Sequence, residues 1–360
     1  MRKTVKASLL GTALALFFGG LAQAEPVAGE TPENSLAGIS LTFASWGGIL
    51  QEGQMASLEH FVQQSGVELL SDPAYEMSKL KAQVEAGNLN WDIVHTSEYD
   101  PYAQCGTLVQ PLDLTIVDTS KLPGGHYTEC GVPALLYGIV LMYNTEKYGD
   151  NPPASWKDFF DVEAFPGTRA IQGSSSPSGS LLEASLLAQG GDPATMLTED
   201  AAAVIDQALK PIRDNSESFM FWTTGAEQQN MMEAGEADMI MAWTGRAMNA
   251  VKNGAPYQPS WNQWLVVEDY LAVPKGAKNP AASNALINAY LGAEAQAKFA
   301  EMTSYSPVNI DSKPVLEPEV AAFQISTPER IEQSYRHNVK YWVSHYDVMV
   351  AKWSEFVAGY

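Results

Sequence analysis

Residues 43–54 read FASWGGILQEGQ, and this stretch marks the passage from a predicted strand to a predicted helix. The apolar run 39–44 has the length and composition of a buried strand. Ser45 and a Trp-Gly-Gly turn follow, and then Met55 and Leu58 recur at helical spacing. A strand, a glycine-rich turn and a helix in this order predict the first unit of an α/β fold.

Strands and helices continue to alternate beyond this stretch. We expect strands at 67–70 and 92–96, with a helix before each one and Gly66 at the end of the first helix. This alternation predicts a mostly parallel, doubly wound sheet. The long apolar run 134–143 then predicts a strand that crosses into a second lobe.

A second lobe is expected after this crossing. Strands are predicted at 168–172 and 238–243, and a strand at 270–273 is predicted to return the chain to the first lobe. The chain is also longer than one hydrophobic core usually serves. We therefore predict an α/β fold of two lobes joined by a hinge, each lobe a mostly parallel sheet flanked by helices. The predicted domains are lobe 1 at 38–139 plus 270–312 and lobe 2 at 140–269 plus 313–360.

The N-terminal residues predict export. Arg2, Lys3 and Lys6 precede an apolar segment, and Ala-Gln-Ala at 22–24 gives a small-x-small cleavage pattern. Residues 1–24 are therefore predicted to be a secretory signal peptide, and the polar residues 25–37 a flexible leader. No other run approaches the length of a membrane helix, so a soluble, periplasmic product is expected.

The net charge limits the classes of molecule that this chain can bind, and the two cysteines indicate a disulfide. The formal net charge is −21 at pH 7, which disfavours nucleic acid and anionic lipid as partners. Solubility explains most of this charge, although it also suits a cationic ligand. Cys105 and Cys130 are the two cysteines, and in an exported chain they predict a disulfide. A metal site is the alternative, which the lack of a nearby histidine pair disfavours.

Patterns typical of an active site are missing from the sequence. The five histidines, including His95, are scattered without metal-ligand spacing such as H-E-x-x-H. A G-x-S-x-G elbow is absent, and the serine-rich loop 173–179 lacks the lysine of a phosphate-binding loop. We predict no cofactor, no metal and no enzymatic activity, with an exported hydrolase as an open alternative.

Residues that suit a small nitrogen compound follow the expected strands. In open α/β sheets, ligands bind outside the carboxyl ends of the strands. Aromatic rings with a few carboxylates hold an ammonium group by cation–π contact and charge pairing. Core packing is the alternative role for the tryptophans, and a surface ion pair for Arg246. The candidate ligand-binding residues at these places are Trp46, Gly47, Gly48, Ser97, Glu98, Tyr99, Ser174, Ser175, Trp243, Arg246, Asp269, Tyr270 and Tyr305.

In these stretches the chain resembles the periplasmic substrate-binding proteins of ABC importers, specifically the spermidine/putrescine-binding family. The similarity covers nearly the whole chain after residue 24 and keeps its order. Segments that carry it include FASWGGILQEGQ, KLKAQVEAGNLNWDIVHTSEYD, ECGVPALLYGIVLMYNTEKYG, FWTTGAEQQNMMEAGEADMIMAWTGRA and DYLAVPKGAKN.

The resemblance implies a type II, two-lobe binding protein, monomeric and without a cofactor. Such a protein closes on a small molecule and delivers it to the permease subunits of an importer in the membrane. The positions that match polyamine-contacting residues of the family are Trp46, Ser97, Tyr99, Trp243, Asp269 and Tyr305.

Departures from the polyamine pattern favour a zwitterion. The loop 173–179 carries no acid before Glu183, and Val267 stands where the family places a second tryptophan. Arg246 follows Trp243 by three residues, and a guanidinium binds a carboxylate bidentately. The ligand is therefore expected to be a polyamine-type cation or an amino-acid-like or betaine-like zwitterion. A ferric-ion binder and a partner of a sensory receptor are further alternatives.

Overall fold

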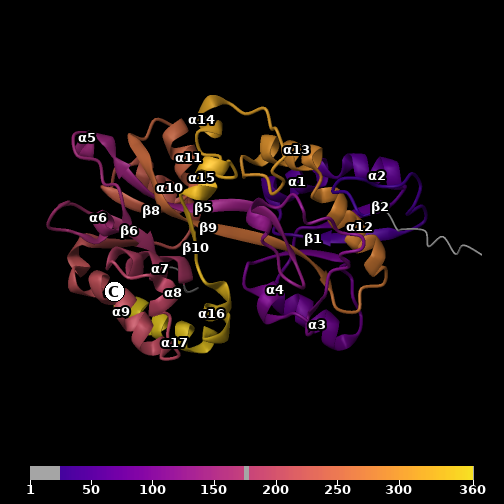
Figure 1. Ribbon diagram of the computed structural model, residues 1–360, viewed down its shortest axis with the longest axis horizontal. Helices are drawn as coiled ribbons and strands as arrows, with labels where there is room; N and C mark the ends of the chain where they lie inside the picture. The colour runs from indigo at the N-terminus through magenta and orange to yellow at the C-terminus, as the bar shows by residue number, and fades with distance from the viewer. Residues whose placement is uncertain (1–24, 174–177, 360) are drawn as a thin grey trace, which may run out of the picture.

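The computed structural model describes residues 25–173 and 178–359 (Figure 1). The predicted signal peptide and the candidate residues Ser174 and Ser175 lie outside the described residues. One ten-stranded sheet runs through the molecule in the order β2-β1-β3-β9-β5-β8-β6-β7, and β4 and β10 also pair with β9. The strands are β1 Ser40–Ala44, β2 Glu68–Asp72, β3 Ile93–Thr96, β4 Val109–Gln110, β5 Val132–Asn144, β6 Arg169–Gln172, β7 Phe219–Trp222, β8 Met239–Trp243, β9 Tyr257–Pro274 and β10 Ser334–Arg336.

Two lobes meet at the long strands β5 and β9. The parallel strands β2, β1 and β3 form lobe 1, and the parallel strands β7, β6 and β8 form lobe 2. Between them, β5 and β9 pair antiparallel with each other, and they border β8 and β3 respectively. Figure 1 shows lobe 1 on the right, lobe 2 on the left and the two crossing strands in the middle. The predicted fold class is thus confirmed.

Helices lie on both sides of this sheet (Figure 1). Their bounds are α1 Gly48–Ser57, α2 Glu59–Ser65, α3 Met77–Ala86, α4 Asp100–Ala103, α5 Thr145–Tyr148, α6 Trp156–Phe160, α7 Gly179–Ala188, α8 Pro193–Met196, α9 Ala201–Asp214, α10 Gly225–Glu233, α11 Thr244–Lys252, α12 Pro280–Tyr290, α13 Ala293–Thr303, α14 Pro318–Ala321, α15 Pro328–Glu332, α16 Val339–Ser344 and α17 Tyr346–Val357, with short 3-10 turns at Pro123–Gly125 and Ser216–Ser218. No helix in the described part of the chain combines the length and apolar character needed to cross a bilayer.

Local sequence explains several element ends. Gly66 ends α2 in the left-handed conformation, as predicted, because a residue without Cβ adopts a positive φ at little cost. Thr224 and Glu227 form a reciprocal capping box at the start of α10. The strands predicted at 67–70 and 92–96 agree with β2 and β3 to within two residues at each end.

The return strand is longer than the sequence predicts. The residues 270–273 were expected to form it, whereas β9 begins at Tyr257 and has 18 residues. In its first half apolar and polar residues alternate only weakly, and Gln263 there has a φ of 57°. This half is extended because β5 pairs with it from Asn144 onward, and such pairing overrides a weak local preference.

The disulfide between Cys105 and Cys130 is present, as predicted, with the two Cα atoms 5.5 Å apart. It ties the turn after α4 to the loop that leads into β5. Cys130 is fully buried in a small core of lobe 1 that also contains Leu80 and Trp91. The bond therefore closes a covalent loop around the part of lobe 1 next to the crossing strands.

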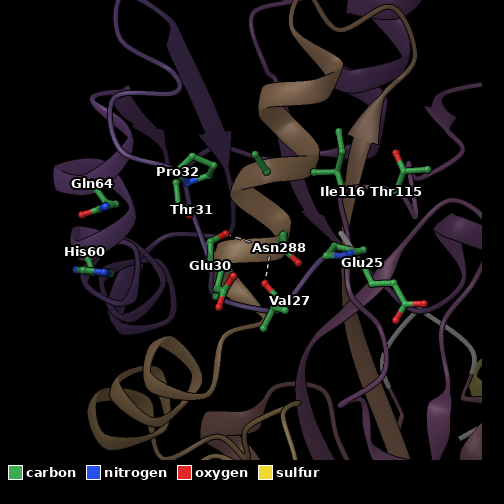
Figure 2. Close-up of a pocket in the computed structure, with 13 residues that line it drawn as sticks. Glu25, Val27, Glu30, Thr31, Pro32, His60, Gln64, Thr115, Ile116 and Asn288 are labelled. Atoms are coloured by element: carbon green, nitrogen blue, oxygen red, sulfur yellow. Dashed lines mark hydrogen bonds between the residues drawn. The ribbon is translucent and has the colours of Figure 1, made fainter. Parts of the chain in front are cut away.

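Residues 25–37, predicted as a flexible leader, are hydrogen-bonded to lobe 1. The side-chain amide of Asn288 on α12 donates to the carbonyls of Val27 and Glu30 at 2.9 and 3.3 Å (Figure 2). The backbone N–H of Gly29 donates to the Asn288 carbonyl at 2.9 Å. These residues border a groove of about 630 Å³ that also contacts His60, and none of the candidate ligand-binding residues lines it.

Candidate ligand-binding site

The turn between β1 and α1 presents Trp46 to solvent. Gly47 has a φ of 76°, and a Cβ there would lie 3.2 Å from Cβ of Pro73, so glycine is required on both counts. Trp46 is 43% exposed, whereas most tryptophans of the described chain are buried. Its ring centroid lies 4.6 Å from that of His95. Trp46 is therefore a surface ring supported from beneath, and the core alternative for it does not hold.

A carboxylate lies next to this ring. Asp269 is on β9, and its Oδ2 atom is 3.6 Å from Nε2 of His95, with 15% of the Asp269 side chain exposed. His95 lies in β3 and is fully buried. Because His95 contacts both the ring of Trp46 and the carboxylate of Asp269, an aromatic face and a negative charge stand together at the end of lobe 1.

Tyr137 on β5 connects this group to lobe 2. Its ring centroid lies 6.4 Å from that of Trp243 and 6.4 Å from that of Tyr305, in edge contacts with both. Burial raises the pKa of Tyr137 well above its ordinary value, and the carboxylates of Asp269 and Glu98 raise it further. Tyr137 was not predicted, because it lies in an apolar run that indicates only a buried strand. A single hydroxyl in a strand that crosses between lobes is the signal that would have found it.

The end of β8 and the start of α11 place Trp243 and Arg246. Trp243 packs edge-on against Trp222 with centroids 4.9 Å apart, and its backbone N–H donates to the Gln228 side chain at 2.9 Å. A Cβ on Gly225 would lie 2.8 Å from Nε of Arg246, so this glycine makes room for the guanidinium group. Arg246 is exposed. Among the described residues, its guanidinium has neither a carboxylate nor a hydrogen-bond partner.

Opposite charges act on Tyr305. Burial raises the pKa of this phenol, Asp269 raises it further, and Arg246 lowers it. Tyr305 also stacks on Phe299, with ring centroids 6.4 Å apart and an angle of 11° between the planes. Tyr305 thus lies within electrostatic reach of a carboxylate and of a guanidinium that is not neutralised by the described residues.

The residues after β3 join the lobes. Oε1 of Glu98 lies 3.0 Å from Nε2 of His337, which follows β10. Burial disfavours the charged form of His337, but Glu98 and Glu183 together outweigh burial, and the pKa of His337 is raised. Tyr99 lies beside Tyr346 of α17, with centroids 6.4 Å apart. Glu98 is therefore paired within the protein, although it was predicted to face the ligand.

Two further predicted residues are engaged elsewhere. The hydroxyl of Ser97 donates to Oδ2 of Asp100 at 2.9 Å. The hydroxyl of Tyr270 donates to Oε2 of buried Glu268 at 2.9 Å and lies 3.2 Å from Nδ1 of His126. Adjacent residues of a strand point to opposite faces, so Tyr270 is turned away from the side on which Asp269 lies.

The structure therefore brings together some of the predicted residues and adds two. Gly48 begins α1 with a φ of 59°, and a Cβ on it would meet nothing within 4 Å, so it borders open space. The group that shares contacts or electrostatic reach consists of Trp46, Trp243, Arg246, Asp269 and Tyr305, together with His95 and Tyr137, which were not predicted.

Comparison with known proteins identifies the family. Residues 58–324 match the family described as bacterial extracellular solute-binding protein, and the chain belongs to this family. It is a substrate-binding protein of the ABC-transporter type, a class that captures a small molecule and delivers it to a permease. The family resemblance inferred from the sequence is confirmed.

Some relatives are named for γ-aminobutyric acid and others for spermidine and putrescine. A γ-aminobutyric acid-binding protein of Pseudomonas aeruginosa is 27% identical over 329 residues, which cover 89% of this chain and 91% of the relative. Spermidine/putrescine-binding periplasmic protein 1 of Haemophilus influenzae is 27% identical over 291 residues, covering 73% and 74%. A solved structure entitled "Structure of Atu4243-GABA receptor" is 33% identical and has a TM-score of 0.77, covering 89% of this chain and 98% of that chain.

Proposed function

We propose that this protein binds a small zwitterion with an ammonium group at one end and a carboxylate at the other, of the γ-aminobutyrate type. The protein would hold it between the lobes and deliver it to an importer from the periplasm. The observation that carries the proposal is Arg246, an exposed guanidinium that no described carboxylate neutralises and whose charge acts on Tyr305 together with the opposite charge of Asp269.

The ammonium end of the ligand would bind in lobe 1. Asp269 supplies the negative charge, and the exposed ring of Trp46 supplies a face for cation–π contact. Both groups rest on His95, so they are held close to each other. Closure of the lobes would exclude water and strengthen the charge interaction.

The carboxylate end would bind in lobe 2. A guanidinium binds a carboxylate through two parallel hydrogen bonds, which an ammonium ligand cannot use. Arg246 lies in the first turn of α11, where the free backbone N–H groups also favour an anion. A diamine would instead bring a second positive charge toward Arg246 and be repelled by it.

The names of the relatives support this ligand class. Both the Pseudomonas aeruginosa protein and the solved receptor structure are named for γ-aminobutyric acid, which carries one amine and one carboxylate. These relatives are solute-binding proteins rather than enzymes, which also favours binding over the hydrolase alternative.

A polyamine is the second candidate ligand. Two carboxylates, Asp269 and Glu98, act on Tyr137, and the chain has a net charge of −21. The Haemophilus influenzae relative is named for spermidine and putrescine. Against this candidate, Glu98 is paired with His337 and therefore leaves one free carboxylate in the described group.

Calorimetric titration with γ-aminobutyrate and putrescine tests the proposal. We expect γ-aminobutyrate to bind more tightly than putrescine. Arg246→Gln should weaken γ-aminobutyrate binding by roughly 10- to 100-fold, because a hydrogen bond to a charged group is lost, and should leave putrescine binding unchanged or improved. Arg213→Gln is the matched control, since Arg213 pairs with Asp206 on the surface of lobe 2. Tighter putrescine binding, or full γ-aminobutyrate affinity in Arg246→Gln, would refute the zwitterion proposal.

A further inference from the structure

His95 is a buried histidine of the candidate site to which the proposed function assigns no direct contact with the ligand. It is fully buried in β3, beneath the ring of Trp46. Its Nδ1 atom lies 2.9 Å from Nε2 of Gln54 and 3.1 Å from the hydroxyl of Ser45. Its Nε2 atom faces Asp269 and has no hydrogen-bond partner among the described residues. A buried donor without a partner calls for an explanation.

Neighbouring hydrogen bonds determine where the imidazole carries its proton. The amide oxygen of Gln54 accepts from the hydroxyl of Ser45 at 2.8 Å. The amide nitrogen of Gln54 therefore faces Nδ1 of His95 and donates to it at 2.9 Å, and the neutral ring must carry its proton on Nε2.

This tautomer aims an N–H group at Asp269. The distance from Nε2 to Oδ2 is 3.6 Å, slightly longer than a hydrogen bond, so a small movement of the carboxylate completes the bond. The opposite tautomer would face the carboxylate with a lone pair and would repel it. The hydrogen bonds from Ser45 to Gln54 and from Gln54 to His95 thus direct the Nε2–H group at Oδ2 of Asp269. The other carboxylate oxygen of Asp269 is left free.

We propose that His95 is a positioning residue of the ammonium subsite: it holds Oδ2 of Asp269 through its Nε2–H group and supports Trp46 from beneath. The ligand's ammonium then meets the remaining oxygen of Asp269 and the outer face of Trp46. This inference rests on the proposed function in taking Asp269 as the ammonium-binding group.

Two substitutions test the roles of the two ring nitrogens, Nε2 and Nδ1, separately. His95→Gln places an amide near the position of Nε2 and can still donate to Asp269. His95→Asn places an amide near Nδ1, keeps a partner for Gln54 and leaves Asp269 without its donor. Both remove the ring beneath Trp46, so a difference between them reports the contact with Asp269.

Titration with γ-aminobutyrate, and with putrescine in parallel, is the first measurement. We expect His95→Asn to bind at least about tenfold more weakly than His95→Gln, the loss typical of a hydrogen bond to a charged group. Equal affinities in the two variants would overturn the positioning role while leaving the proposed function intact. If the wild-type protein binds neither compound, the proposed function fails.

The second measurement is made without ligand and therefore does not depend on binding. Nitrogen-15 NMR of histidine-labelled protein should show His95 as the neutral Nε2–H tautomer, assigned by loss of its signals in His95→Gln. Asp269→Asn should shift the Nε2 signal and leave the Nδ1 signal in place. A proton on Nδ1, or a spectrum indifferent to Asp269→Asn, would overturn the inference.

Discussion

Glu98→Gln is expected to weaken the joint between the lobes. Glu98 belongs to the segment after β3 of lobe 1, and His337 lies between β10 and α16, where its other ring nitrogen is 3.3 Å from the hydroxyl of Ser180 in lobe 2. The two charged atoms are 3.0 Å apart, and the side chains are 1% exposed for His337 and 10% for Glu98. Glutamine keeps the size of the side chain and removes its charge.

The expected loss of folding stability follows from the burial of this ion pair. Removing one partner of a buried ion pair costs about 3 to 5 kcal/mol, and the retained amide places this variant near 3 kcal/mol. For the roughly 335 residues from 25 to 359, the unfolding entropy is about 0.7 kcal/mol/K. The melting temperature should therefore fall by about 4 °C.

The loss should depend on pH in a defined direction. Burial lowers the pKa of His337, the carboxylates of Glu98 and Glu183 raise it, Arg336 lowers it, and the net pKa is raised. A raised pKa in the folded state contributes stability that is complete below the unfolded value of about 6.5 and is lost as the pH rises through the folded value. The difference between the wild type and Glu98→Gln should thus be largest near pH 6 and shrink toward pH 9.

Thermal melts between pH 6 and 9 measure this effect. Glu59→Gln is the control, because the Glu59–Lys298 pair is exposed and should be worth less than about 1 kcal/mol. A melting temperature unaffected by Glu98→Gln, or lowered equally at pH 6 and pH 9, would refute the assignment of a charged interlobe pair.

Two further substitutions test the candidate site and the disulfide of lobe 1. Trp46→Ala should weaken γ-aminobutyrate binding in calorimetry while lowering the melting temperature by no more than a degree or two, because the ring is 43% exposed; a large loss of stability would instead assign Trp46 to packing. Cys105→Ser should destabilise the protein by about 3.5 kcal/mol, since the disulfide spans 25 residues, and should lower the melting temperature by roughly 5 °C. Melts with and without a reductant check this value, and an unchanged melting temperature in both cases would contradict it.

Much of the fold can be predicted from local sequence patterns. The run before Ser45, the glycine after α2 and the alternation of strands and helices predict lobe 1 closely, because strand burial and helix ends depend on nearby residues. The disulfide was predictable because an exported chain with two cysteines has one possible pairing. The turn at Gly47 even indicates that Trp46 stands at the end of a strand.

Tertiary structure decided which residues lie together in the candidate site. Asp269 and Tyr270 are neighbours in sequence and both were predicted to bind ligand, yet strand alternation sends one toward His95 and the other toward Glu268. Which face of β9 borders the candidate site depends on how β9 lies between β3 and β5, and no local pattern contains this information. The pairing of Glu98 with His337 likewise joins segments far apart in the chain.

The sequence by itself therefore determined the two-lobe fold and the family, and it nominated Trp46, Arg246 and Asp269. Only the tertiary structure revealed that Tyr137 and His95 belong to the same group and that Glu98 is paired within the protein. The physical reason is that periodicity and capping act over a few residues. Charge pairing and ring contacts act through space, between strands that the fold alone brings together.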